Sequence, residues 1–331
     1  MKNLFLLICF CFLSNFYFSQ KDTVGYTLLE DNPEFNFISG GMDILNVSFD
    51  NNAWPWGTGG SVQLEFDPIY GALNYCFAGS MANWVQDPTS SSNNGAISIY
   101  RNRDGGTKSE ISGYVGYSFK KWKEKGKAII TLANRSKVTV VTSVDATYEK
   151  KYALELGFKK GFSYYQSIVD GGGNGFMAVP YLENDQLGNS NPTQLNARTT
   201  LEYTIVNLGF SFIKKHDVVI DVEDYGHKRG HAFMRFYGRL SFLINSNLDD
   251  VHKPVDDDWD NGSPHFKYNI NDNTPMNKVG FNLGISSQIP KGLGGYRAVE
   301  FGYFPGPKVG ITNNLYLFGK VGFSFAALFK K

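Results

Sequence analysis

Residues 315–329, LYLFGKVGFSFAALF, decide the fold of this chain. From Leu315 to Phe329 every second residue is apolar or glycine, while the positions between them include Lys320 and Ser324. A period of two indicates a β-strand with one apolar face. Strands of soluble proteins average about five or six residues, and this pattern runs much longer. A long strand with an apolar outer face is what a membrane-spanning β-barrel requires, because closure of the sheet pairs every backbone group.

The same alternation recurs upstream, for example at Phe281 and Leu283 and again at Phe236 and Leu240. Ten strands are predicted, at residues 38–50, 59–67, 69–80, 109–121, 146–168, 200–213, 230–246, 276–289, 296–304 and 313–329. Their connections are mostly long at one end and tighter at the other, and an even strand number then places both termini on the periplasmic side. The prediction is an all-β fold, a transmembrane antiparallel β-barrel of about ten strands, with eight to twelve allowed because strands one to three have the weakest pattern.

The segment at residues 122–145 is too long for a simple turn. We predict a periplasmic excursion there, with a small hairpin formed by residues 128–132 and 138–142. No internal repeat and no linker divides the chain, so residues 38–331 are predicted to form a single outer-membrane barrel domain.

The first residues predict export. Residues 1–19, MKNLFLLICFCFLSNFYFS, combine Lys2 with a short apolar run and a polar end, which is the pattern of a secretory signal peptide. Cleavage after Ser19 leaves residues 20–37 as a short periplasmic segment before the barrel. Both early cysteines leave with the signal peptide, so Cys76 is expected to form no internal disulfide.

The composition excludes two other classes of protein. The chain carries 32 basic and 31 acidic residues, and loss of Lys2 with the signal peptide makes the two numbers equal. Such a balance argues against a nucleic-acid partner. Aromatic residues make up 15 % of the chain, which excludes a disordered protein.

Two stretches carry a family resemblance. The end of the chain, LYLFGKVGFSFAALFKK, resembles the terminal strand of outer-membrane β-barrel proteins, although Lys330 and Lys331 follow the last aromatic residue. Residues 143–165, SVDATYEKKYALELGFKKGFSYY, are similar to a membrane strand of such barrels from Bacteroidota-type bacteria. The resemblance implies a location in the cell outer membrane, in contact with its lipid, and recognition of the last strand by the outer-membrane assembly machinery. It singles out no functional subfamily.

If the apolar faces contact lipid, the opposite faces line the lumen. The residues assigned to this lumen network are Glu65, Asn74, Glu155, Lys159, Arg235, Arg239, Asn282, Glu300 and Lys320, and Cys76 falls on the same face. A barrel of about ten strands leaves little free bore, and buried charges need partners. The first expectation is therefore a structural plug of salt bridges. The alternative is a narrow pore or binding pocket lined by Arg235 and Arg239, which would favour anionic solutes.

The predicted function is non-enzymatic, namely a structural, solute-passage or partner-docking role, with no cofactor. One alternative is a barrel enzyme of the protease or lipase type, for which only His252 and His265 are predicted to reach the outer side. Another is an accessory subunit of an outer-membrane complex. Trp54, Trp56 and Trp84 lie in or beside the outer loops, where aromatic residues favour either a protein partner or the aromatic girdle of the membrane boundary.

Metal sites are weakly indicated. Asp256, Asp258 and Asp260 alternate in an acidic loop, a spacing that hard cations such as calcium use, but Lys267 stands where a bidentate glutamate is needed. A solvated acidic loop is the main interpretation. His227 and His231 have the spacing of a zinc site on a helix but are predicted at a turn and a strand start, so no metal site is expected there.

Overall fold

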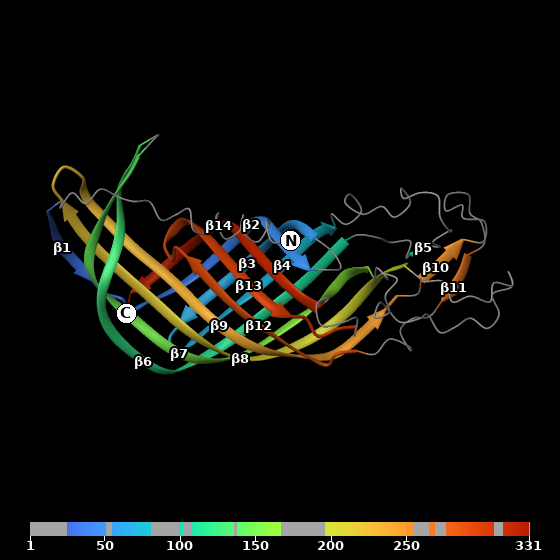
Figure 1. Ribbon diagram of the computed structural model, residues 1–331. Helices are drawn as coiled ribbons and strands as arrows, with labels where there is room; N and C mark the ends of the chain where they lie inside the picture. The colour runs from blue at the N-terminus through green and yellow to red at the C-terminus, as the bar shows by residue number, and fades with distance from the viewer. Residues whose placement is uncertain are drawn as a thin grey trace. The chain divides into compact units, whose positions relative to one another are not determined.

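Ten strands of the computed structural model are antiparallel neighbours around a closed β-barrel (Figure 1). The structure describes residues 25–50, 55–80, 99–101, 107–135, 138–166, 196–249, 251–254, 265–268, 276–307 and 314–330. No helix within these residues is long and apolar enough to cross a membrane. The chain divides into two compact units, a barrel unit of residues 35–122, 149–215 and 232–331 and a small unit of residues 1–34, 123–148 and 216–231.

Ten strands form the ring of the barrel. They are β2 (Phe35–Asp50), β3 (Pro55–Phe66), β4 (Ile69–Ser80), β6 (Thr107–Arg135), β7 (Val138–Gln166), β8 (Asn196–Val222), β9 (Gly226–Leu248), β12 (Val279–Gln288), β13 (Gly292–Tyr303) and β14 (Leu315–Lys330). Each pairs with the next, and β14 pairs with β2 from Tyr316↔Asp50 to Lys330↔Phe35, which closes the sheet. The closed ten-stranded antiparallel barrel confirms the predicted fold class. Three short strands, β5 (Ile99–Arg101), β10 (Val251–Pro254) and β11 (His265–Tyr268), continue the sheet beside β8.

The two ends of the barrel differ. At one end lie the start of β2, the end of β14 and the two-residue turn between Phe66 and Ile69. We call this the turn end. The opposite end, where β3 follows β2 and β6 follows β4, is called the loop end. Each barrel strand therefore has a part near the turn end and a part near the loop end.

Alternate residues of the barrel strands are exposed and buried. On β12, Leu283 is 55 % exposed, whereas its neighbour Asn282 is 1 % exposed. On β14, Phe323 and Phe325 are exposed while Ser324 is buried. Apolar side chains thus cover the outside of the barrel, and polar side chains fill the inside.

Glycine makes room for aromatic rings on the inner face. A side chain at Gly116 would collide with the ring of Tyr70, and one at Gly284 would collide with the ring of Tyr237. Because glycine has no Cβ, both rings can lie close to the backbone of the neighbouring strand. These two tyrosines take part in the polar networks described below.

The small unit has its own apolar core. Its first strand, β1 (Tyr26–Asp31), pairs antiparallel with β8 through Tyr26↔Val222. Ile130 of β6 and Val144 of β7 share a buried cluster with Ile220 of β8. Asp31 accepts hydrogen bonds from the backbone nitrogen of Thr147 at 2.9 Å and from its hydroxyl at 2.6 Å.

The small unit departs from the sequence prediction. The predicted hairpin segments 128–132 and 138–142 do lie on paired strands, but they are the continuation of β6, which runs on to Arg135, and of β7, which begins at Val138. The connection expected at residues 214–229 is mostly strand, since β8 continues to Val222. Residues 20–37, expected as a short periplasmic segment, include β1 and the start of β2. These segments form strands because their apolar residues are buried in a core of their own.

Candidate functional site

A cluster of buried charges and aromatic rings lies in the lumen near the turn end. Lys151 Nζ lies 2.8 Å from Glu65 Oε1, 2.8 Å from Asp67 Oδ1 and 3.0 Å from Glu149 Oε1. Lys215 Nζ lies 3.5 Å from the same Glu65 oxygen and 3.2 Å from Glu149 Oε1. Lys151 and Lys215 are 0 % and 1 % exposed.

Apolar side chains pack in the same part of the lumen. The buried cluster consists of Phe35, Phe37, Tyr70, Ala153, Ile213 and Phe233. The ring of Phe37 meets that of Phe233 edge-on, with 5.2 Å between centroids. We call this cluster, together with the charges of Glu65, Asp67, Glu149, Lys151 and Lys215, the turn-end plug.

A pair of arginines lies next along the lumen. Arg239 Nε donates to Glu155 Oε2 at 2.7 Å, and Arg235 Nη1 donates to Glu155 Oε1 at 3.2 Å. Tyr70 also donates its hydroxyl to Glu155 Oε1, at 2.7 Å. One carboxylate therefore neutralises two guanidinium groups, each of which is less than a tenth exposed.

Two tyrosine rings hold the arginines in place. The Cζ atom of Arg235 lies 3.8 Å from the ring centroid of Tyr114 and 4.5 Å from that of Tyr237. For Arg239 the corresponding distances are 4.7 Å and 4.3 Å. Such cation–π contacts are favourable where water is excluded, and they fix the orientation of both side chains.

Toward the loop end the charges lie among tyrosine hydroxyls. Lys159 Nζ donates to Glu300 Oε1 at 2.9 Å, and Glu300 also accepts the hydroxyls of Tyr237 at 2.8 Å and Tyr316 at 2.6 Å. Glu110 accepts the hydroxyl of Tyr203 at 2.6 Å, and Lys108 lies 4.0 Å from the same carboxylate.

A further group lies on β2, β4, β13 and β14. Lys320 Nζ donates to Asn74 Oδ1 at 2.9 Å and lies 3.9 Å from Asp43 Oδ1. The Tyr296 hydroxyl donates to Asp43. Cys76 is a free cysteine on the same side of β4 as Asn74.

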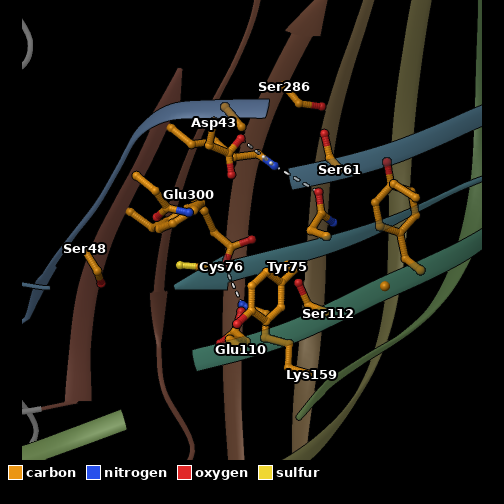
Figure 2. A pocket seen from close by; sticks show the side chains of 18 of the residues that line it. Asp43, Ser48, Ser61, Tyr75, Cys76, Glu110, Ser112, Lys159, Ser286 and Glu300 are labelled. Carbon is orange, nitrogen blue, oxygen red and sulfur yellow. Dashed lines mark hydrogen bonds and ion pairs between the residues drawn. The ribbon is translucent and has the colours of Figure 1, made fainter. Parts of the chain in front are cut away.

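These groups surround a cavity of about 180 Å³. Figure 2 shows side chains from several strands converging on it, among them Asp43, Cys76, Glu110, Lys159 and Glu300. Its aromatic lining is formed by Tyr75, Tyr114, Phe158, Tyr203, Phe233, Tyr237, Tyr296, Phe304, Tyr316 and Phe318. The charged residues of the turn-end plug do not line it. We call this cavity the lumen pocket.

All nine residues assigned to the lumen from sequence are buried or half-buried in the structure. The structure brings together Glu155 with both arginines, Lys159 with Glu300, and Asn74 with Lys320. Asn282 donates to the hydroxyl of Ser241 at 3.3 Å, and Glu65 lies in the turn-end plug.

Sequence reasoning missed several members of these networks. Glu149 and Lys151 lie on the same parity of β7 as Glu155, so strand periodicity could have identified them. Asp43 precedes an irregularity of β2 that shifts the register between Asp43 and Asn46, and this disturbs the alternation. The lumen tyrosines carry no charge, so only their position on the inward-facing side of a strand could have indicated that they line the lumen.

The other candidate residues lie apart from the lumen pocket or outside the described residues. His227 is exposed, with its Nε2 atom 3.5 Å from Asp221 Oδ1, and Trp56 is 51 % exposed on β3. No group of three potential metal ligands occurs among the residues that the structure describes. Outside the described residues lie Asp256, Asp258, Asp260, Trp54, Trp84 and the predicted signal peptide at residues 1–19.

No protein-family model and no curated protein matches the sequence. Among solved structures, the outer-membrane expressed OmpT of Vibrio cholerae matches 91 % of this chain and 100 % of its own, with 9 % identity and a TM-score of 0.17. A TodX deltaS2S3 mutant, a monoaromatic hydrocarbon channel, matches 91 % of both chains with 10 % identity and a TM-score of 0.19. The high-pH structure of Pseudomonas putida OprB matches 89 % of this chain and 94 % of its own, with 8 % identity and a TM-score of 0.18. TM-scores this low carry no structural argument. The barrel is defined by the pairing register of its strands, and the candidate site is defined by the geometry of its side chains.

Proposed function

We propose that the protein is a non-enzymatic, integral outer-membrane β-barrel whose lumen binds a solute but does not conduct freely. One observation carries the proposal. The barrel is apolar on the outside all the way around, while interlocked charges and rings are buried in its polar interior at the turn end.

The outer surface supports a lipid environment. Large apolar side chains are exposed on every barrel strand, including Leu154 at 61 %, Leu240 at 54 % and Phe325 at 68 %. A soluble protein rarely exposes a continuous apolar surface of this extent. A lipid-facing barrel requires it, because its backbone groups pair within the closed sheet and its side chains meet hydrocarbon.

The turn-end plug supports a closed lumen. A barrel of about ten strands has little interior space once side chains are placed, and here Lys151, Phe35 and Phe37 are fully buried. Free passage of ions would require both the ion pairs and the rings to move. The lumen pocket, in contrast, leaves space for a bound molecule.

The resemblance of the last strand to the terminal strand of outer-membrane β-barrel proteins suggests insertion by the assembly machinery. In this arrangement the turn end, with the start of β2 and the end of β14, faces the periplasm. The long connections then face the exterior.

A lipid-facing substitution tests the membrane location. Leu283→Arg places a charge on the exposed face of β12, which would cost about 2–4 kcal/mol in a bilayer and almost nothing in water. We expect lower folding efficiency into liposomes and loss of the heat-dependent mobility shift on SDS gels. Leu28→Arg is the matched control, because Leu28 is 44 % exposed on β1 in the small unit.

Conductance across planar bilayers tests the closed lumen. The wild-type chain should insert and give no stable openings. Equal tolerance of Leu283→Arg and Leu28→Arg would contradict the membrane location, and steady openings of wild-type protein would contradict the closed lumen.

A further inference from the structure

The lumen pocket carries more positive than negative charge. Five inward-facing cations line it, namely Lys108, Lys159, Arg235, Arg239 and Lys320. The carboxylates within 4.0 Å of these cations are Asp43, Glu110, Glu155 and Glu300. Arg297 also borders the pocket but is exposed. Among the described residues the set therefore has one cation in excess, and a buried charge without a counter-ion is costly.

The excess charge lies at the pair of arginines, and Arg235 is the less well neutralised of the two. Arg239 Nε donates to Glu155 Oε2 at 2.7 Å, and its Nη2 atom lies 2.7 Å from the same oxygen but makes no hydrogen bond among the described residues. Arg235 reaches Glu155 only through Nη1, at 3.2 Å, on an oxygen that Tyr70 also uses. Its Nε atom is buried and has no hydrogen-bond partner among the described residues, although the side chain is only 4 % exposed.

Arg235 is a preorganised anion-binding group. The rings of Tyr114 and Tyr237 fix its guanidinium, so little further side-chain freedom would be lost when a ligand binds. Guanidinium groups bind carboxylates and phosphates through charge-assisted hydrogen bonds. Lys320 is a second, loosely neutralised cation of the pocket, since Asp43 Oδ1 lies 3.9 Å from its Nζ atom.

The remaining walls suit an apolar body. The hydroxyls of Tyr203, Tyr237, Tyr296 and Tyr316 already donate to carboxylates of the protein. What these tyrosines offer a ligand is mainly their ring surface. The pocket measures about 180 Å³, and an apolar cavity of about 150 Å³ is known to hold benzene.

We propose that the lumen pocket binds one small organic monoanion, a carboxylate whose apolar body is about the size of one aromatic ring. This inference rests on the proposed function and specifies the ligand class of the same lumen. The carboxylate supplies the missing negative charge and accepts a hydrogen bond from Arg235, while its body lies against the tyrosine rings.

Calorimetry on the folded full-length chain in a neutral detergent tests the inference with benzoate as the probe. Benzoate should bind with one site per chain. Benzyl alcohol, which has the ring but no charge, should bind at least about 10-fold more weakly, because a hydrogen bond to a charged group contributes about 1.5–3 kcal/mol. Inorganic phosphate, which has charge but no apolar body, should also bind more weakly than benzoate.

Variants locate the binding site. Arg235→Met should weaken benzoate binding at least about 10-fold, and Arg235→Lys should retain part of the affinity because it keeps the charge without the fork of donors. Lys160→Met is the matched control, since Lys160 is exposed on β7 next to the pocket residue Lys159. It should bind benzoate like the wild type.

Several outcomes would overturn the inference. They are equal binding of benzyl alcohol and benzoate, tighter binding of phosphate, no benzoate binding by folded protein, and unchanged binding in folded Arg235→Met. Folding of each sample is read from its heat-dependent mobility on SDS gels. A wild-type chain that shows this shift and a closed lumen yet binds no benzoate refutes the ligand class alone, whereas loss of the shift or open conductance refutes the proposed function.

Discussion

The turn-end plug and the lumen pocket are built from the same residue types but differ in how their charges are matched. In the plug, Lys151 has three carboxylates within 3.5 Å and Lys215 has two. In the pocket, Arg235 and Arg239 share the single carboxylate of Glu155. Among the described residues the plug has no unmatched cation and is filled by rings. The pocket, in contrast, has an open volume and two guanidinium nitrogens, Arg235 Nε and Arg239 Nη2, without a hydrogen-bond partner. The difference indicates that charge matching inside this barrel separates a structural region from a binding region.

The largest effect on the stability of the barrel is expected from a substitution of Glu155. Glu155→Gln removes the carboxylate that the two buried arginines share, and no other carboxylate among the described residues forms an ion pair with either of them. Breaking such a buried pair costs about 3–5 kcal/mol, so the variant should unfold at a much lower urea concentration in liposomes. Glu202→Gln, at an exposed position of β8, is the matched control and should unfold like the wild type.

Benzoate provides a second test of the Glu155→Gln variant. An anion in the pocket supplies part of the missing charge, so benzoate should raise the urea midpoint of Glu155→Gln more than that of the wild type. A Glu155→Gln barrel as stable as the wild type would show that the arginines do not depend on this carboxylate.

A smaller effect is expected within the plug, where each cation has more than one partner. Lys151→Met should destabilise the barrel by about 3 kcal/mol, because Lys215 remains as a second cation for Glu65 and Glu149. The double variant Glu65→Gln, Lys151→Met should cost less than the sum of the two single changes, with a coupling of about 0.5–3 kcal/mol. Urea unfolding of the four proteins measures this coupling.

Strict additivity in that cycle would mean that Glu65 and Lys151 do not interact in the folded barrel.

Stability measured with benzoate present also distinguishes the turn-end plug from the lumen pocket. Benzoate should stabilise the plug variants as much as the wild type, since the pocket residues are intact.

The barrel could be predicted from sequence because, along most barrel strands, apolar residues occupy every second position without interruption. On β12 the apolar residues all fall on the outer face, and on β14 most of them do, so the approximate bounds, the fold class and the lumen face follow from alternation. The same rule fails where the parity of burial reverses. On β7, Tyr148 and Ala146 are buried at even positions, whereas Glu149 and Lys151 are buried at odd ones.

A second reversal occurs on β8, where Lys215 and Asp217 are buried at odd positions and Val218 and Ile220 at even ones. Where the buried positions change from odd to even, the alternation in the sequence is interrupted, and the interruption resembles the end of a strand. This explains why residues 122–145 and 214–229 were predicted as connections. The pairing of charges across the lumen could not be predicted from the sequence either, because it depends on the register between strands that are distant along the chain.

An exposed ion pair of the small unit provides the contrast to both buried clusters and the smallest expected effect. Lys127 Nζ lies 2.6 Å from Asp145 Oδ1, and both side chains are largely exposed. The hydrogen bond from Lys127 lowers the pKa of the Asp145 carboxyl, and the same bond raises the pKa of Lys127. The pair therefore contributes stability above the ordinary pKa of an aspartate and below that of a lysine, and the contribution is lost as the pH falls through the folded pKa of Asp145.

Asp145→Asn should thus lower the urea midpoint slightly near neutral pH and at low salt, because solvent and ions screen exposed charges. The difference from the wild type should disappear at a pH below the folded pKa of Asp145, where the wild-type carboxyl is protonated as well. Urea titrations at the two pH values measure it, with Glu155→Gln run in parallel as the buried counterpart. If Asp145→Asn proved as damaging as Glu155→Gln, burial would not be what makes the lumen charges costly to unpair, and the contrast between plug and pocket would lose its physical basis.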